Sequence, residues 1–115
     1  VFSFHDIVEP DVIFVAPDQL DILTAKNIQG TPAMVVEILS ASTRKRDQQI
    51  KPSLYDRMGV REYWLVDPER NAVSVYRRDT KGSLSLIAGL AAAGHDTLET
   101  PLLPGWSVEL TRLFR

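Results

Sequence analysis

The chain has 115 residues, of which 44% are hydrophobic and 24% charged, with a formal net charge of −2 and no cysteine. This length suffices for one compact domain, and the charge argues against a protein that holds nucleic acid mainly through bulk positive charge. Without cysteine, disulfides and thiolate metal sites are excluded, so any metal must be held by oxygen ligands or His, which favours a hard cation such as Mg²⁺ or Mn²⁺. No apolar run is long enough to cross a bilayer, and the lack of cysteine favours a cytoplasmic protein.

Two apolar segments early in the chain predict strands of a sheet. Residues 10–15 are rich in β-branched and aromatic side chains and lie between two prolines, which is typical of a strand. A polar stretch follows, with a short helical turn near residues 18–23. Residues 33–39 form an apolar run without polar alternation, which is typical of a strand buried on both faces. Glu37 is the single charged residue in that run.

The charge of Glu37 within this apolar run indicates a functional site. An ionised carboxylate inside a core costs several kcal/mol unless a cation compensates it. Asp11 at the start of the first strand and Lys51 downstream could join it, because two carboxylates on adjacent strands can hold a divalent cation. A nearby lysine can stabilise the negative charge that develops on a phosphate. Asp11, Glu37 and Lys51 therefore predict a metal-dependent phosphodiesterase site.

Residues 44–58 predict the principal helix. Apolar residues recur four apart, and Gly59 directly after the segment is a typical helix end. Pro52 lies inside the segment and disfavours helical geometry at Lys51. Two possibilities follow: the helix is kinked at Pro52, or its regular part begins there.

The second half of the chain contains short apolar segments separated by turn residues. Segments 60–66 and 72–77 flank a short turn and therefore predict an antiparallel hairpin. Residues 90–94 predict a loop of small residues. Further strands are predicted at 83–88, 97–100 and 108–110.

One long helix among several strands predicts an α+β fold, with a mixed β-sheet and the principal helix packed on it. We expect a single domain over residues 1–115. Because the chain opens within a strand-like segment at residues 1–4, we expect it to be a fragment that lacks N-terminal elements.

Several segments resemble the Uma-type family of putative restriction endonucleases, within the PD-(D/E)XK nuclease superfamily. The resemblance covers nearly the whole chain and is strongest over residues 35–40 and 59–68. The other segments that carry it are Glu9-Pro-Asp-Val12, Ser42-Thr43, Asp47-x-x-x-Lys51, Tyr55 and Leu103-Pro-Gly105. The resemblance implies a restriction endonuclease-like fold and Mg²⁺-dependent hydrolysis of DNA phosphodiester bonds.

The resemblance also implies roles for individual residues. Asp11 and Glu37 resemble the metal carboxylates, and the backbone carbonyl of Ile38 would be a further ligand. Leu39 occupies the standard place of the superfamily's lysine, and Lys51 on the helix resembles the relocated lysine of this family. Tyr55, one turn later, resembles a residue that lines the site. Apart from the resemblance, the basic run that contains Arg44 and Arg46 could contact phosphates beside this site.

Other interpretations of the same residues remain open. Asp11 could be a turn residue, and Glu37 could pair with an arginine or with Lys51 as a structural ion pair. Lys51 could instead be a solvated residue that bridges Asp47, and Tyr55 could be a core aromatic. The alternatives to an endonuclease are thus a non-catalytic nuclease-fold domain that binds DNA or protein and a purely structural dimerisation domain. A homodimer is plausible for an enzyme that cuts both strands.

Overall fold

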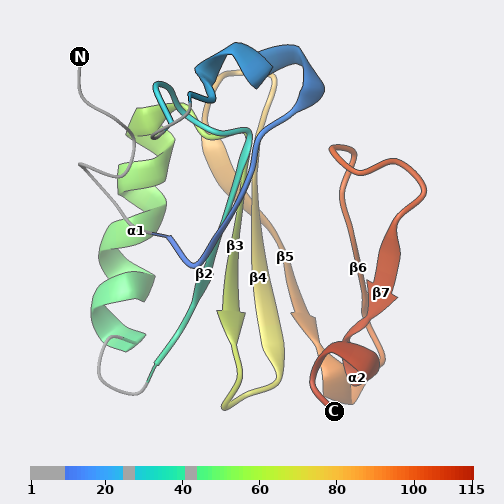
Figure 1. Cartoon of the computed structure of the whole chain (residues 1–115). Helices are drawn as coiled ribbons and strands as arrows, with labels where there is room; N and C mark the ends of the chain where they lie inside the picture. The colour runs from blue at the N-terminus through green and yellow to red at the C-terminus, as the bar shows by residue number, and fades with distance from the viewer. Residues whose placement is uncertain (1–9, 25–27, 41–43) are drawn as a thin grey trace.

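The structure is a computed structural model that describes residues 10–24, 28–40 and 44–115, without the side chains of residues 44–50. The predicted strand at residues 1–4 lies outside this range. A five-stranded sheet has its strands in sequence order, and only the two strands β2 and β3 run parallel (Figure 1). These strands are β1 (Val12–Phe14), β2 (Met34–Ile38), β3 (Glu62–Asp67), β4 (Ala72–Arg78) and β5 (Leu84–Ala91).

The sheet separates two layers (Figure 1). Helix α1 (Arg44–Met58) makes the crossover that the parallel pair β2 and β3 requires, and it packs on one face. The opposite face carries the small antiparallel sheet of β6 (Thr97–Glu99) and β7 (Ser107–Glu109), followed by the short helix α2 (Leu110–Leu113). Two 3₁₀ turns complete the described elements: η2 (Pro17–Ile22) and η3 (Ala92–Gly94).

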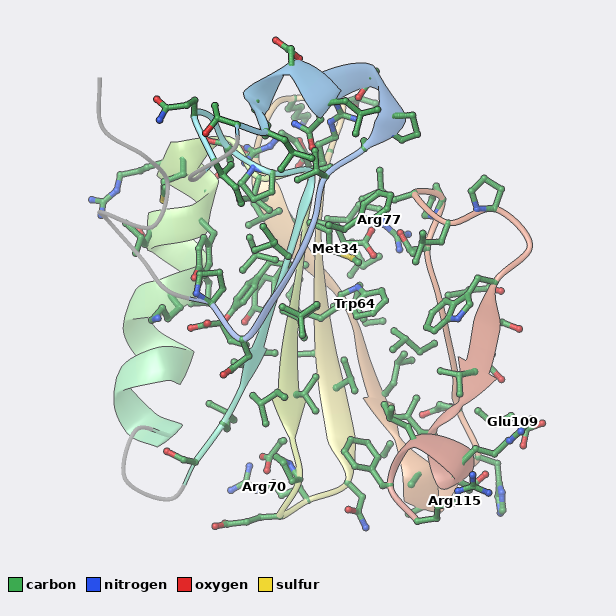
Figure 2. All side chains as sticks on the ribbon, in the orientation of Figure 1. Met34, Trp64, Arg70, Arg77, Glu109 and Arg115 are labelled. Carbon is green, nitrogen blue, oxygen red and sulfur yellow. The ribbon has the colours of Figure 1, made fainter. Side chains whose placement is uncertain are left out.

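Strand alternation divides the apolar residues between two cores. Val35 and Tyr63 belong to the core beneath α1, where Tyr55 of the helix is fully buried. Their neighbours Val36 and Trp64 belong to the core on the other side. Figure 2 shows Trp64 directed toward β6 and β7. The strands β2 and β3 are therefore buried on both faces, as their continuous apolar runs predict.

The observed architecture confirms the predicted α+β fold, a mixed sheet with one principal helix, and the hairpin of β3 and β4. Helix α1 runs from Arg44 to Met58 with Pro52 inside it, so its regular part does not begin at this proline. Within the described residues, no helix is long and apolar enough to cross a membrane.

Two local predictions near the end of the chain are wrong. Residues 90–94 were expected to form a loop, but β5 continues to Ala91 and a 3₁₀ turn follows. Pairing of Leu90 with Val73 and of Ala91 with Ala72 holds this backbone in the sheet and overrides the low strand propensity of small residues. Leu110 was expected to end a strand, but it begins α2 and its side chain is completely buried.

Candidate functional site

Glu37 lies near the end of strand β2, on the face that α1 covers. Only 4% of the residue is exposed. Nζ of Lys51, from α1, lies 2.6 Å from Oε2 of Glu37, and the lysine side chain is 20% exposed. The structure thus supplies the buried carboxylate with a lysine as its cation, and that lysine still reaches solvent.

Asp11 is exposed and directly precedes β1. The antiparallel register pairs Val12 with Val36, so its extension by one residue places Asp11 opposite Glu37. The backbone N–H of Ile38 donates a hydrogen bond to Oδ2 of Asp11 at 2.6 Å. Because the N–H and C=O of one strand residue point toward the same neighbouring strand, the Ile38 carbonyl also faces the Asp11 side. The chain therefore brings Asp11, Glu37, Ile38 and Lys51 to one end of the β1–β2 pair.

The donor atoms at this end of the sheet suit a small hard cation. Asp11 and Glu37 offer carboxylate oxygens from two adjacent strands, and Ile38 adds a carbonyl oxygen. Mg²⁺ is commonly held by one or two carboxylates and keeps several of its water ligands. Among the described residues there is no group of three or more His, Cys, Asp or Glu side chains placed to hold a metal ion. Any Mg²⁺ or Mn²⁺ held by Asp11, Glu37 and the Ile38 carbonyl would therefore keep several of its water ligands.

The remaining predicted site residues lie apart from this point or outside the described side chains. Tyr55 is completely buried and its ring centroid lies 5.0 Å from that of Tyr63. It is therefore a core residue one helical turn beyond Lys51. The side chains of Arg44 and Arg46 lie outside those that the structure describes, as does that of Asp47, the alternative partner of Lys51.

A second buried acid was missed in the sequence. Glu62 of β3 is 1% exposed, accepts a hydrogen bond from Nε1 of Trp64 at 2.7 Å, and pairs with Nε of Arg77 at 2.5 Å. The rule that singled out Glu37, a charged residue in a buried strand, applies equally to Glu62. A buried acid in this fold can thus be satisfied by an arginine.

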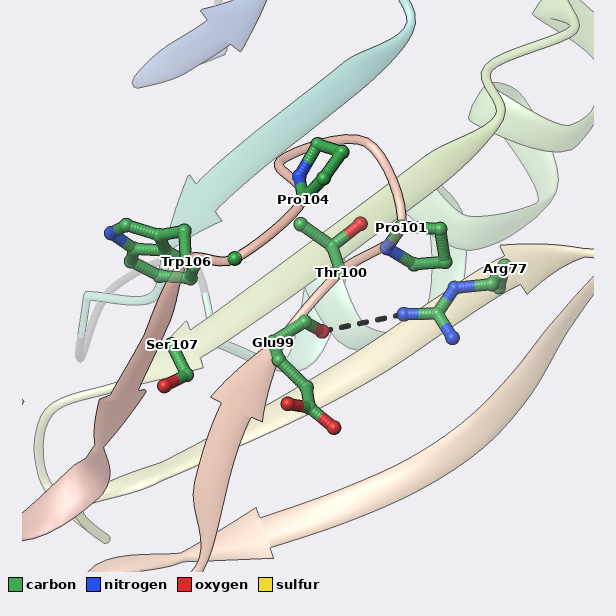
Figure 3. A pocket seen from close by; sticks show the side chains of 8 residues that line it. Arg77, Glu99, Thr100, Pro101, Pro104, Trp106 and Ser107 are labelled. Atoms are coloured by element: carbon green, nitrogen blue, oxygen red, sulfur yellow. Dashed lines mark hydrogen bonds between the residues drawn. The ribbon is translucent and has the colours of Figure 1, made fainter.

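Arg77 also borders a surface cavity of about 430 Å³ on the face that carries β6 and β7 (Figure 3). Its Nη2 donates a hydrogen bond to the Glu99 carbonyl at 3.4 Å, and Trp106 and Ser107 are among the other lining residues. Asp11, Glu37 and Lys51 do not line this cavity. It is a separate feature on the opposite side of the sheet.

Comparisons with known proteins agree with this architecture. A solved structure, described as a putative nuclease belonging to DUF820 from Anabaena variabilis, matches with a TM-score of 0.63 and 18% sequence identity. The match covers 89% of this chain and 52% of that one, so the chain spans about half the length of that protein. No curated protein matches the chain. The family model named Uma2, described as "putative restriction endonuclease", matches residues 2–111. The chain therefore belongs to the Uma2 family of putative restriction endonucleases.

Proposed function

We propose that this chain is a metal-dependent endonuclease that hydrolyses phosphodiester bonds in DNA. Membership of the Uma2 family supports a nuclease, and the fold is similar to that of a protein described as a putative nuclease. The observation that carries the proposal for this chain is the meeting of Asp11, Glu37 and Lys51. The lysine from α1 contacts Glu37, and the register of β1 and β2 places Asp11 opposite Glu37, although 40 positions of sequence separate Asp11 from Lys51.

Each residue has a distinct proposed role. Asp11, Glu37 and the Ile38 carbonyl would hold Mg²⁺ or Mn²⁺. When bound, this ion would polarise a phosphoryl oxygen and lower the pKa of a water molecule. Lys51 balances the charge of the buried Glu37 carboxylate and donates hydrogen bonds to the negative charge that develops on the scissile phosphate.

The residues around this centre have supporting roles in the proposal. Tyr55 anchors the helical turn beneath Lys51, because its ring is packed in the core against Tyr63. Arg44 and Arg46, at the start of α1, would contact the DNA backbone without reading its sequence. Two copies of the chain would cut the two strands of a duplex as a two-fold dimer.

A second candidate is a non-catalytic nuclease-fold domain that binds DNA or a partner protein. One observation favours it: the 2.6 Å ion pair between Lys51 and Glu37 already satisfies the buried carboxylate. In this candidate the pair is purely structural, as the pair of Glu62 with Arg77 is on the other face. The two candidates differ in whether the binding of divalent metal ions and the cleavage of DNA depend on Glu37.

A plasmid-nicking assay separates them. Supercoiled DNA is incubated with the wild-type chain and Mg²⁺ or Mn²⁺, with and without EDTA. We expect metal-dependent nicking that Asp11→Asn and Glu37→Gln each slow by at least about 10²-fold, since each change removes a metal carboxylate. Asp21→Asn, at an exposed acid of η2, is the matched control and should nick at the wild-type rate. DNA binding by the wild-type chain without nicking in either metal would favour the second candidate.

A further inference from the structure

Arg78, at the end of β4, uses every N–H donor of its guanidinium group within the protein. Nε and Nη2 donate to the carbonyl of Val60 at 3.0 and 2.8 Å. Nη1 donates to Oδ1 of Asp56 at 2.8 Å and to the carbonyl of Gly82 at 2.7 Å. Nη2 also donates to the Asp56 carbonyl at 3.1 Å. An arginine has five N–H donors, so this one has none left for a substrate.

These bonds fasten the C-terminal end of α1 to the hairpin of β4 and β5. The helix ends in a Schellman motif, in which the N–H of Gly59 reaches the Asp56 carbonyl and the N–H of Val60 reaches the Tyr55 carbonyl. Arg78 adds donors to two carbonyls of this end, where a positive charge also complements the helix dipole. The Asp56 side chain completes the connection by accepting a hydrogen bond from the N–H of Leu84 at 3.0 Å.

The position of α1 along its axis decides where Lys51 lies. Lys51 precedes Asp56 by five residues, which is about 7.5 Å along a helix. Apolar contacts such as those of Tyr55 and the half-buried Leu54 resist separation from the sheet but are non-directional. Hydrogen bonds depend steeply on distance and angle, so the bonds of Arg78 resist sliding and rotation of the helix.

We infer that Arg78 is a positioning residue of the proposed nuclease site, which it serves by holding α1 in the register that brings Lys51 to Glu37. This inference rests on the proposed function. The neighbouring Arg77 serves the other face of the sheet, where it pairs with Glu62. Two consecutive arginines thus stabilise opposite layers, and only Arg78 is connected to the helix that carries Lys51.

A double-mutant cycle tests whether Arg78 acts through Lys51. We expect Arg78→Gln to lower kcat for plasmid nicking by about 10- to 10²-fold with little change in KM, because a misplacement of about 1 Å can cost that much. In a Lys51→Met background, the same change should lower kcat no further. Arg61→Gln is the matched control, because the Arg61 side chain forms an exposed ion pair with Asp18 of η2. An equal loss in both backgrounds would overturn the inference.

A second measurement needs no catalysis and so separates this inference from the proposed function. In protein with labelled lysine and glutamate, an NOE between the ε protons of Lys51 and the γ protons of Glu37 reports their contact. We expect the NOE in the wild type and in Arg61→Gln, and its loss in Arg78→Gln. If the wild type does not nick DNA but this pattern appears, the positioning role stands and the proposed function fails. An unchanged NOE in Arg78→Gln would overturn the positioning role. Should Arg78→Gln not fold, Arg78→Lys supports the same comparison, because a lysine has only three donors.

Discussion

Lys51 and Glu37 form an ion pair with 2.6 Å between Nζ and Oε2, and this pair joins the middle of helix α1 to the end of strand β2. Asp11, directly before β1, lies opposite Glu37 in the register of β1 and β2 and accepts a hydrogen bond from the N–H of Ile38. The proposed chemistry depends on these contacts, because they place two carboxylates, a carbonyl and an ammonium group at one end of the sheet. Several independent changes test this arrangement.

Lys51→Met should separate catalysis from metal binding. Removal of a preorganised donor to the developing charge commonly lowers kcat by about 10²- to 10³-fold, and we expect that loss in plasmid nicking. Mn²⁺ affinity should be retained, because the proposed metal ligands are oxygen atoms of other residues. Lys81→Met, at an exposed lysine in the turn between β4 and β5, is the control and should leave kcat unchanged. Equal activity of the two variants would exclude a catalytic role for Lys51.

Asp56 should make the attachment of α1 sensitive to acid. The hydrogen bond from the Leu84 N–H, followed by that from Arg78, lowers the pKa of the Asp56 carboxyl below its ordinary value of 3.8. A carboxyl with a lowered pKa in the folded state stabilises the protein above the unfolded value, and this contribution is lost as the pH falls through the folded value. We therefore expect Asp56→Asn to lower the melting temperature at pH 7 and to have a smaller effect once the pH falls well below the ordinary carboxyl value of 3.8. A difference in melting temperature that is constant across this range would contradict the role of the charged carboxylate.

The pair of Glu62 with Arg77 should matter for stability and not for chemistry. Arg77→Leu leaves the buried Glu62 carboxylate without its cation, which should reduce the free energy of unfolding by about 3–5 kcal/mol. Urea titrations of the single variant and of Arg77→Leu/Glu62→Gln measure this, and the second change should recover part of the loss. Nicking per folded molecule should remain at the wild-type level. A loss of kcat in the folded fraction would instead connect this face to the site.

Gly59→Ala should weaken the end of α1 through backbone conformation alone. Gly59 has a φ of +84°, which is unfavourable for alanine, yet an added Cβ would meet nothing within 4 Å. We expect a loss of about 1–2 kcal/mol in the free energy of unfolding, measured with urea. Gly89→Ala is a matched control, since its Cβ also meets nothing within 4 Å and its φ lies outside the left-handed region. Equal effects of the two changes would contradict a conformational cause at Gly59.

The sequence predicted the fold from strong local patterns. The strand β2 is visible as a continuous apolar run. The hairpin of β3 and β4 is visible as two apolar segments with turn residues between them. The same hairpin could also have predicted the pair of Glu62 with Arg77, because a register that pairs Asp67 with Ala72 also pairs those two residues. The missed signal was the second acid in a buried strand.

The remaining features depend on contacts that no local pattern specifies. Lys51 could have paired with Asp47 on its own helix, and only the packing of α1 on the sheet brings it to Glu37. The five hydrogen bonds of Arg78 depend on where the helix end meets the β4–β5 hairpin, so spacing along the chain does not predict them.

Isothermal titration of Mn²⁺ into the wild-type chain and into Glu37→Gln tests the proposed metal site most directly. Binding to the wild type through the Asp11 and Glu37 carboxylates should be strongly weakened in the variant, which keeps the shape of the side chain but removes its charge. A melting curve of each protein verifies that both are folded. Saturable binding that is lost in Glu37→Gln is the predicted result. The absence of Mn²⁺ binding by the folded wild type would contradict the account and leave Glu37 as a structural acid paired with Lys51.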